Sequence, residues 1–164
     1  VDILMPPLSP TELYLGFIIG GICRGLFVGS VVIVVVEVFV GLSIHSISAI
    51  LAFALLGTMM LASIGLAAGI WSQKFDHIAA FQNFVILPMT FLSGVFYSVQ
   101  SLPPMWQTVS HVNPFFYLID GFRAGFFGRP DVPLELSIFV VSMVTVFLSL
   151  GCFSLIRSGY KLRG

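Results

Sequence analysis

The chain has 164 residues, of which 58% are hydrophobic and only 9% charged, and its mean hydropathy is +1.08. These values exclude an ordinary soluble domain, because too few polar residues are present to cover its surface and the uncharged stretches are longer than core helices. Seven basic and seven acidic side chains give a formal net charge of zero, which gives no indication of nucleic-acid binding.

Residues 1–12 precede the first long apolar run. Ser9 and Glu12 have the spacing of a capping box, in which each side chain binds the backbone amide of the other residue. Pro10 lies between them, at the first helical position, where proline is favoured. We therefore predict a helix that begins at Pro10 with Ser9 as its N-cap.

Four long apolar stretches follow, and each exceeds the roughly 20 residues that a helix needs to cross a hydrocarbon core. Their continuous apolar character, without the alternation of barrel strands, predicts helices. The first stretch, residues 13–44, is longer than one crossing requires, so its membrane portion is expected to begin near Gly20. The predicted spans cover residues 20–44, 47–71, 77–97 and 134–156.

The first span carries Gly21, Gly25 and Gly29, a small residue at every fourth position. Gly65 and Gly69 repeat this pattern in the second span. Small residues let two helix backbones approach closely in a membrane. We favour packing within the chain over a subunit interface, since the pattern does not identify the partner.

Glu37 and Arg24 are the charged residues inside the first span. Intramembrane charges usually face a protein interior or a wet cavity, which makes Glu37 a candidate for lining a pathway. A purely structural pairing of Glu37 remains the alternative. Arg24 lies near the cytoplasmic end of its span and can extend its head group to the lipid interface.

The third span contains Pro88, which has no amide hydrogen to donate to the carbonyl of Phe84. We therefore predict a kink at this position. The kink could serve as a hinge, although fixed proline kinks are common in membrane helices, and we favour the fixed kink.

Residues 98–133 separate the third and fourth spans and are rich in proline. Asn113 and Pro114 form a good helix start, and a helix of residues 114–127 would be about 21 Å long, too short to cross. We expect it to lie at, or dip into, the outer leaflet. Asp120 and Arg123 are three residues apart and are expected to form a surface ion pair. The candidate residues of this external element are Pro103, Pro104, Pro114, Asp120 and Arg123.

Basic residues indicate the topology. Four crossings place both chain ends on one side, together with Lys74 in the loop after the second span. Arg157, Lys161 and Arg163 are on this same side. Because basic residues concentrate in cytoplasmic loops, we assign both ends and Lys74 to the cytoplasm.

Several motifs are absent from the sequence. It has no GxxxxGK[ST] phosphate loop, no GxSxG and no HExxH. Cys23 and Cys152 are isolated, with no neighbouring His or Cys at ligand spacing. We therefore assign no catalytic and no metal-binding residues, and any ATP hydrolysis is expected in another chain.

Five sequence segments together resemble a known family. They are FLSGVFYSVQSLPPMW at residues 91–106, HVNPFFY at 111–117, GFRAGFFG at 121–128, LMPPLSP at 4–10 and GGICRGLFVG at 20–29. In the order and spacing in which they occur along the chain, they resemble the type 2 ABC transporter permeases. The segments at residues 4–10 and 20–29 also resemble the YadH-like inner-membrane permeases of bacteria.

This resemblance implies an all-α, multi-pass protein of the bacterial inner membrane with six spans, of which this chain holds the last four. It implies a permease homodimer that is embedded in membrane lipid and bound to two ABC ATPase subunits. The ATPase subunits would bind ATP and Mg, and this chain would bind no cofactor. Residues 1–12 would form a cytoplasmic coupling segment, residues 13–164 the transmembrane permease domain and residues 98–133 an external re-entrant element. The coupling residues would be Leu4, Met5, Leu8, Ser9 and Glu12.

Three functions are compatible with these features. The first is the permease subunit of an ABC exporter that moves an amphipathic substrate, such as a drug-like molecule, a lipid-linked saccharide or a polysaccharide. The second is a secondary transporter or channel with an ion or proton path along Glu37, His77 and Asp120. A membrane scaffold is the third, but it leaves Glu37 without a purpose. We favour the exporter.

Overall fold

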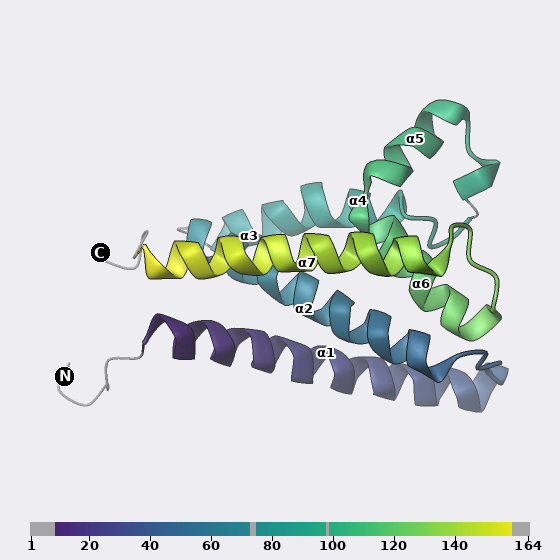
Figure 1. The fold of residues 1–164 in the computed structure, drawn as a ribbon, viewed down its shortest axis with the longest axis horizontal. Helices are drawn as coiled ribbons and strands as arrows, with labels where there is room; N and C mark the ends of the chain where they lie inside the picture. The colour runs from purple at the N-terminus through teal and green to yellow at the C-terminus, as the bar shows by residue number, and fades with distance from the viewer. Residues whose placement is uncertain (1–8, 73–74, 98, 159–164) are drawn as a thin grey trace.

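The computed structural model describes residues 9–72, 75–97 and 99–158, and this part of the chain is helical with no strand (Figure 1). Three long helices, α1 (Pro10–Val40), α2 (Ile47–Trp71) and α7 (Leu134–Arg157), run along the length of the bundle. The beginning of α1 and the end of α7 lie at one end, which we call the terminal end. The all-α fold class is therefore confirmed.

The predicted start of α1 is confirmed. Ser9 is the N-cap, its amide donates to Oε2 of Glu12 over 2.8 Å, and the Glu12 amide donates to Oγ of Ser9 over 3.3 Å. At ~1.5 Å per residue, its 31 residues give a helix about 46 Å long, well above the ~30 Å of a hydrocarbon core. Part of α1 therefore extends beyond the core or α1 is tilted.

The end of the first predicted span is wrong by four residues, because α1 ends at Val40 and not at residue 44. Gly41 has a φ of 71°, a backbone conformation that glycine adopts without strain. Its amide still donates to the carbonyl of Glu37, over 3.0 Å. The positive φ turns the chain away from the helix axis at this point.

The third predicted span is shorter than expected. The helix consists of α3 (Phe75–Phe81), a π-helical turn η1 (Gln82–Ile86) and α4 (Leu87–Phe91), and it ends six residues before the predicted residue 97. The chain turns at Gly94, whose φ is 76°. By length and composition, three helices in the described part of the chain can cross a membrane. The prediction of four transmembrane helices is therefore not confirmed.

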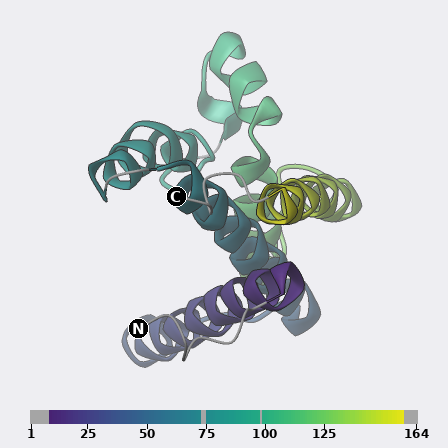
Figure 2. The same cartoon turned by 90° about the vertical axis from the view of Figure 1, so that its left-hand side faces the viewer.

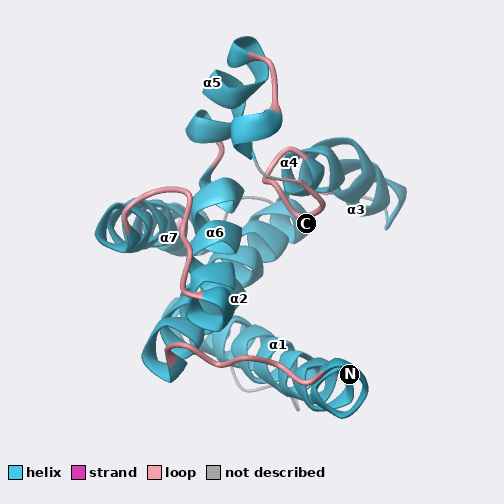
Figure 3. Cartoon of the chain, turned by 90° about the vertical axis from the view of Figure 1, so that its right-hand side faces the viewer, coloured by secondary structure: helices cyan, strands magenta, loops and turns pink. Residues whose placement is uncertain are grey.

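Three shorter helices connect α4 to α7: η2 (Val99–Ser101), α5 (Pro104–Val112) and α6 (Pro114–Phe127). As predicted, α6 begins after Asn113, whose Oδ1 accepts the Phe115 amide over 3.1 Å, and it ends before Gly128. Figures 2 and 3 show the bundle from its two ends, with α5 projecting from it. Figure 3 looks onto the end at which α6 lies, which we call the α6 end.

The core is built on α2, α6 and α7. Phe53 and Met60 of α2 pack with Phe115 and Leu118 of α6 and with Val141 of α7, and all five are buried. In a membrane such side chains stabilise the bundle through close van der Waals packing, because lipid tails are as apolar as the core. α6 thus packs between two long helices and is not confined to the surface of the bundle.

The glycines of α1 pack partly as predicted. A Cβ at Gly21 would lie 2.7 Å from Cβ of Ala62, and one at Gly25 would lie 2.5 Å from Cγ2 of Thr58. Packing within the chain is thus confirmed for these two positions. No neighbouring atom lies within 4 Å of a Cβ placed on Gly29, Gly65 or Gly69. Among the described residues, the prediction of packing within the chain is therefore wrong for these three glycines.

Replacing Gly25 by alanine is expected to destabilise the chain. The Thr58 hydroxyl donates to the carbonyls of Ala54 and Leu55 over 2.8 and 3.0 Å, which fixes the methyl group that the new Cβ would meet. Overpacking of this kind typically costs about 1–3 kcal/mol. The melting temperature of the protein in detergent should fall accordingly.

Gly29→Ala is the matched control on the same helix. It meets no neighbour, and alanine favours a helix over glycine by up to about 1 kcal/mol, so its melting temperature should be unchanged or higher. Equal stability of the two variants would contradict the close α1–α2 contact at Gly25.

Candidate functional site

Three charged side chains at the α6 end, Asp120, Arg123 and Asp131, form an ion-pair network. Nη2 of Arg123 lies 2.9 Å from Oδ1 of Asp120 and 2.9 Å from Oδ2 of Asp131. The side chain of Asp120 is only 1% exposed, whereas that of Arg123 is 30% exposed. The pairing of Asp120 with Arg123 is present as predicted, but its position at the surface was predicted wrongly.

The Asp120 carboxylate also binds the backbone that leads into α7. It accepts the Asp131 amide over 2.9 and 3.1 Å at its two oxygens, and the Val132 amide over 3.3 Å. A charged acceptor strengthens these bonds relative to neutral ones. Asp120 of α6 therefore anchors the loop that precedes α7. The three-residue spacing to Arg123 did not indicate this role.

Small residues bring α6 close to α2. Gly121 lies against the ring of Phe53, and a Cβ at Gly125 would lie 2.5 Å from Cγ1 of Ile50. The carbonyl of Gly125 accepts the amides of His45 and Ser46 over 3.0 and 2.8 Å. The turn between α1 and α2 is thus bound to α6.

Asn113 links α6 to the end of α4. Its Nδ2 donates to the carbonyl of Met89 over 2.6 Å and to Oγ of Ser93 over 2.9 Å, while its Oδ1 caps α6. The Ser110 hydroxyl donates to the carbonyl of Leu92 over 2.8 Å. We call the side chains of Ser93, Ser110 and Asn113 the polar clamp, and all three are buried.

The sequence identified Asn113 only as a cap. Ser93 and Ser110 carry no local signal, because serines are spread throughout the apolar helices and a contact across 18 or 20 residues leaves no periodic pattern.

The two prolines of the external element, Pro103 and Pro104, occupy the N-cap and the first position of α5.

Glu37 lies in the last turn of α1 and is exposed in the described structure. Its Oε2 accepts the Leu42 amide over 2.7 Å, so the carboxylate stabilises the turn after α1. This bond supports the structural alternative for Glu37, and its role in a pathway stays a prediction. Arg24 is exposed on the same helix.

The ion path of the alternative function receives no support from the arrangement of the helices. It would connect Glu37 on α1, His77 on α3 and Asp120 on α6. No two of these three helices pack directly against each other in the described part of the chain.

The π-helical turn η1, in the helix of the third predicted span, lies just before Pro88. The Leu87 amide donates to the carbonyl of Gln82, five residues earlier, which defines the π-helical turn. Pro88 has no amide hydrogen and its ring would clash with the carbonyl of Phe84 in a regular helix, so a wider turn relieves both problems. The helix is thus irregular just before Pro88, while the kink and the hinge at Pro88 remain predictions.

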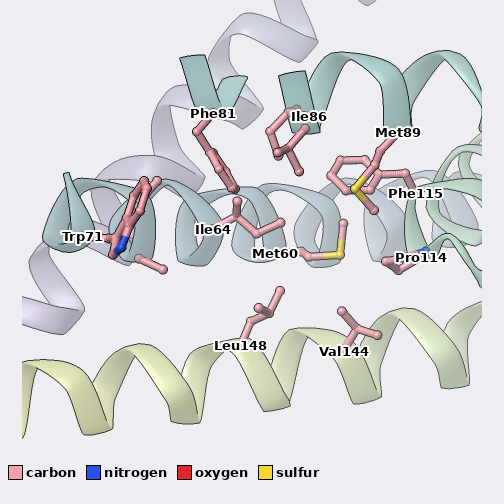
Figure 4. Close-up of a pocket in the computed structure, with 13 residues that line it drawn as sticks. Met60, Ile64, Trp71, Phe81, Ile86, Met89, Pro114, Phe115, Val144 and Leu148 are labelled. Atoms are coloured by element: carbon pink, nitrogen blue, oxygen red, sulfur yellow. The ribbon is translucent and has the colours of Figure 1, made fainter. Parts of the chain in front are cut away.

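Two apolar cavities flank α2. The first, of about 410 Å³, lies between α2, the α3–α4 segment and α7, and Figure 4 shows Phe81 and Ile86 facing Met60 and Ile64 across it. The second, of about 660 Å³, lies between α1, α2 and α6. No charged side chain lines either cavity.

Not all predicted residues can be placed. Leu4, Met5 and Leu8 of the predicted coupling segment, and Lys74, lie outside the described residues. Within the described ranges, no group of three or more His, Cys, Asp or Glu side chains could hold a metal ion.

The chain is similar to a transporter family and to two further proteins. Residues 2–127 match the model of the ABC-2 type transporter family. The chain is 40% identical over 162 residues to the inner membrane transport permease YadH of Escherichia coli (strain K12), covering 99% of this chain and 63% of that protein. It is also 32% identical over 88 residues to nodulation protein J of Neorhizobium galegae, covering 52% of this chain and 34% of that protein. The chain thus spans 63% of the length of the permease.

Asp120→Asn is expected to destabilise the α6 end. The amide side chain keeps the size of the carboxylate but loses its charge and one of its two acceptor oxygens, which weakens the bonds to Arg123 and to the Asp131 and Val132 amides. Arg123 is partly exposed and keeps Asp131 as a partner, so the expected cost is that of lost charge-assisted hydrogen bonds, about 1.5–3 kcal/mol. Hydrogen exchange at the Asp131 and Val132 amides should accelerate, and the melting temperature should fall.

Asp131→Asn is the control, because it leaves Asp120 paired with Arg123 and leaves the backbone amides bound. Its effect on both measurements should be clearly smaller. If the two variants behave alike, Asp120 is not the centre of the network.

Proposed function

Because the chain belongs to the ABC-2 type transporter family, we propose that it is the membrane-spanning permease of an ATP-driven exporter for an amphipathic substrate. The substrate classes that fit are drug-like molecules, lipid-linked saccharides and polysaccharides. The observation that carries the proposal is the 40% identity to an inner membrane transport permease over 99% of this chain. Long helices with exposed apolar side chains, such as Phe27 and Phe147, support a multi-pass protein of the inner membrane.

The energy for transport would come from a separate subunit. The sequence has no phosphate loop that could cradle ATP, so ATP and Mg would bind to an ABC ATPase partner. We further propose that two permease chains assemble in the lipid bilayer on two such ATPases. In this arrangement the chain is not itself an enzyme and does not bind nucleic acid.

The proposed topology places the terminal end in the cytoplasm. Four basic residues, Lys74, Arg157, Lys161 and Arg163, are on that side. The α6 end would then be external, with residues 98–133 forming a re-entrant element there. The helical segment of residues 75–91 would serve as the shortest of four spans, which would be spans three to six of the complete permease.

Reconstitution tests the proposed source of energy. We expect the full-length permease in vesicles to move substrate only when its ATPase subunit and ATP are both present, and we expect the purified permease to hydrolyse no ATP. An ATPase variant that cannot hydrolyse ATP provides the control. Transport by the permease alone in a proton gradient would instead favour the secondary transporter.

The start of α1 is proposed to transmit movements of the ATPase to the bundle. Ser9 and Glu12 form a capping box that fixes the first turn of α1. Losing such a cap costs about 1 kcal/mol, enough to loosen the junction without unfolding the protein. Ser9→Ala combined with Glu12→Ala should therefore lower transport and substrate-stimulated ATPase turnover at normal levels of insertion.

Leu4→Asp separates binding from transmission. If Leu4 fills an apolar pocket of the ATPase, this variant should reduce co-purification of the tagged ATPase, whereas the double variant should still assemble. If both variants assemble and transport like the parent protein, residues 1–12 are only a connector.

A further inference from the structure

The segment of residues 75–91 is attached unevenly along its length. At the α6 end, the polar clamp binds the carbonyls of Met89 and Leu92 through Asn113 and Ser110. Ser93 also donates to the carbonyl of Met89, over 2.6 Å. Buried hydrogen bonds of this kind are costly to break in a membrane, since no water replaces them. The end of α4 is therefore fixed to α6.

The other half of this segment has few contacts. In the described part of the chain, α3 packs against α2 and against no other element outside its own segment. η1 contains no buried residue, and Phe84 is 81% exposed. The 410 Å³ cavity separates Phe81 and Ile86 from α7, as Figure 4 shows. The residues of the arm side that line this cavity, Phe81, Val85 and Ile86, have apolar side chains.

The π-helical turn lies between the fixed half and the loosely packed half. Its bonds span five residues, as from the Leu87 amide to the Gln82 carbonyl, and this geometry is less favourable than that of an α-helix. Pro88 removes one more bond, because it cannot donate to a carbonyl of the preceding turn. Backbone bending therefore meets the least resistance at residues 82–86.

We propose that residues 75–81 form a movable arm that pivots on the π-helical turn at residues 82–86 and opens or closes the apolar cavity, while the polar clamp holds residues 87–93 in place. Pro88 then belongs to the fixed part, and its role is to maintain the adjacent turn. The cavity provides the room into which the arm moves. The side chains that face each other across it, Phe81 and Ile86 on one side and Met60 and Ile64 on the other, are apolar, so no polar group loses a hydrogen-bond partner when they approach.

Distances between spin labels in the full-length permease test this proposal without any substrate or ATPase. One label pair joins the arm to α7 (Ala80→Cys and Phe147→Cys), and the other joins the clamped part to α7 (Leu87→Cys and Phe139→Cys). All four positions are exposed. The native cysteines are first replaced by alanine, and labelled protein is diluted with unlabelled protein in lipid nanodiscs so that one labelled copy is measured.

The arm pair should give a distance distribution at least about twofold broader than that of the clamped pair. Asn113→Asp should then broaden the clamped pair. Aspartate caps a helix as well as asparagine does, but it cannot donate to Met89 or Ser93. Ser110→Ala removes a single clamp bond and should broaden the clamped pair less. Tyr117→Phe, which removes a bond to the carbonyl of His111 on the same helix, should change neither pair.

Two results would overturn the proposal. One is an arm pair as narrow as the clamped pair, which would mean that the whole segment is rigid. The other is a clamped pair that stays narrow in both Asn113→Asp and Ser110→Ala, which would mean that packing and not the polar clamp fixes this part. Neither result depends on transport, so both are distinguishable from a failure of the exporter function.

Discussion

A membrane protein must satisfy every backbone amide and carbonyl within the hydrocarbon region from its own groups, because lipid offers no hydrogen-bonding partner. The short helices α5 and α6 and the cap residue Asn113 supply such partners to three neighbouring segments. Asn113 and Ser110 of α5 bind carbonyls at the end of the α3–α4 segment, Asp120 binds the amides before α7, and the Gly125 carbonyl binds the turn before α2. Two short helices therefore hold the ends of three longer elements.

This role requires α6 to lie very close to α2. Gly121 and Gly125 of α6 face Phe53 and Ile50, and Gly57 of α2 faces the side chain of Leu118. Larger residues at the three glycines would push the two helices apart and lengthen the bonds to the turn before α2. Close packing and polar satisfaction at the α6 end thus depend on the same contacts. α7 packs differently against α2, through a contact of 3.3 Å between the hydroxyls of Ser63 and Ser149 and a bond from the Cys152 thiol to the Ser63 carbonyl.

The sequence predicted the local features well because their causes are local. The capping box at Ser9 and the helix start at Asn113 each depend on a few adjacent residues, and both are present in the structure. The burial of Asp120 could not be predicted, because its partners are 11 and 12 residues away and belong to a loop. Hydropathy also placed the end of the third segment too late, since residues 92–97 are apolar but turn at Gly94.

The two ends of the bundle are stabilised by different forces, and this difference bears on how an exporter could work. The α6 end has many directional polar bonds between elements. Nearer the terminal end the contacts are more often apolar, such as the edge contact of Tyr14 with Phe153, although Ser149 and Cys152 of α7 also bind Ser63 there. Apolar contacts lack strict geometry, so helices can shift there at lower cost than where buried polar groups would lose their partners. If an ATPase acts on the start of α1, its force is applied at the end where the helices can move. The polar bonds of the α6 end would then keep the opposite end together during that movement.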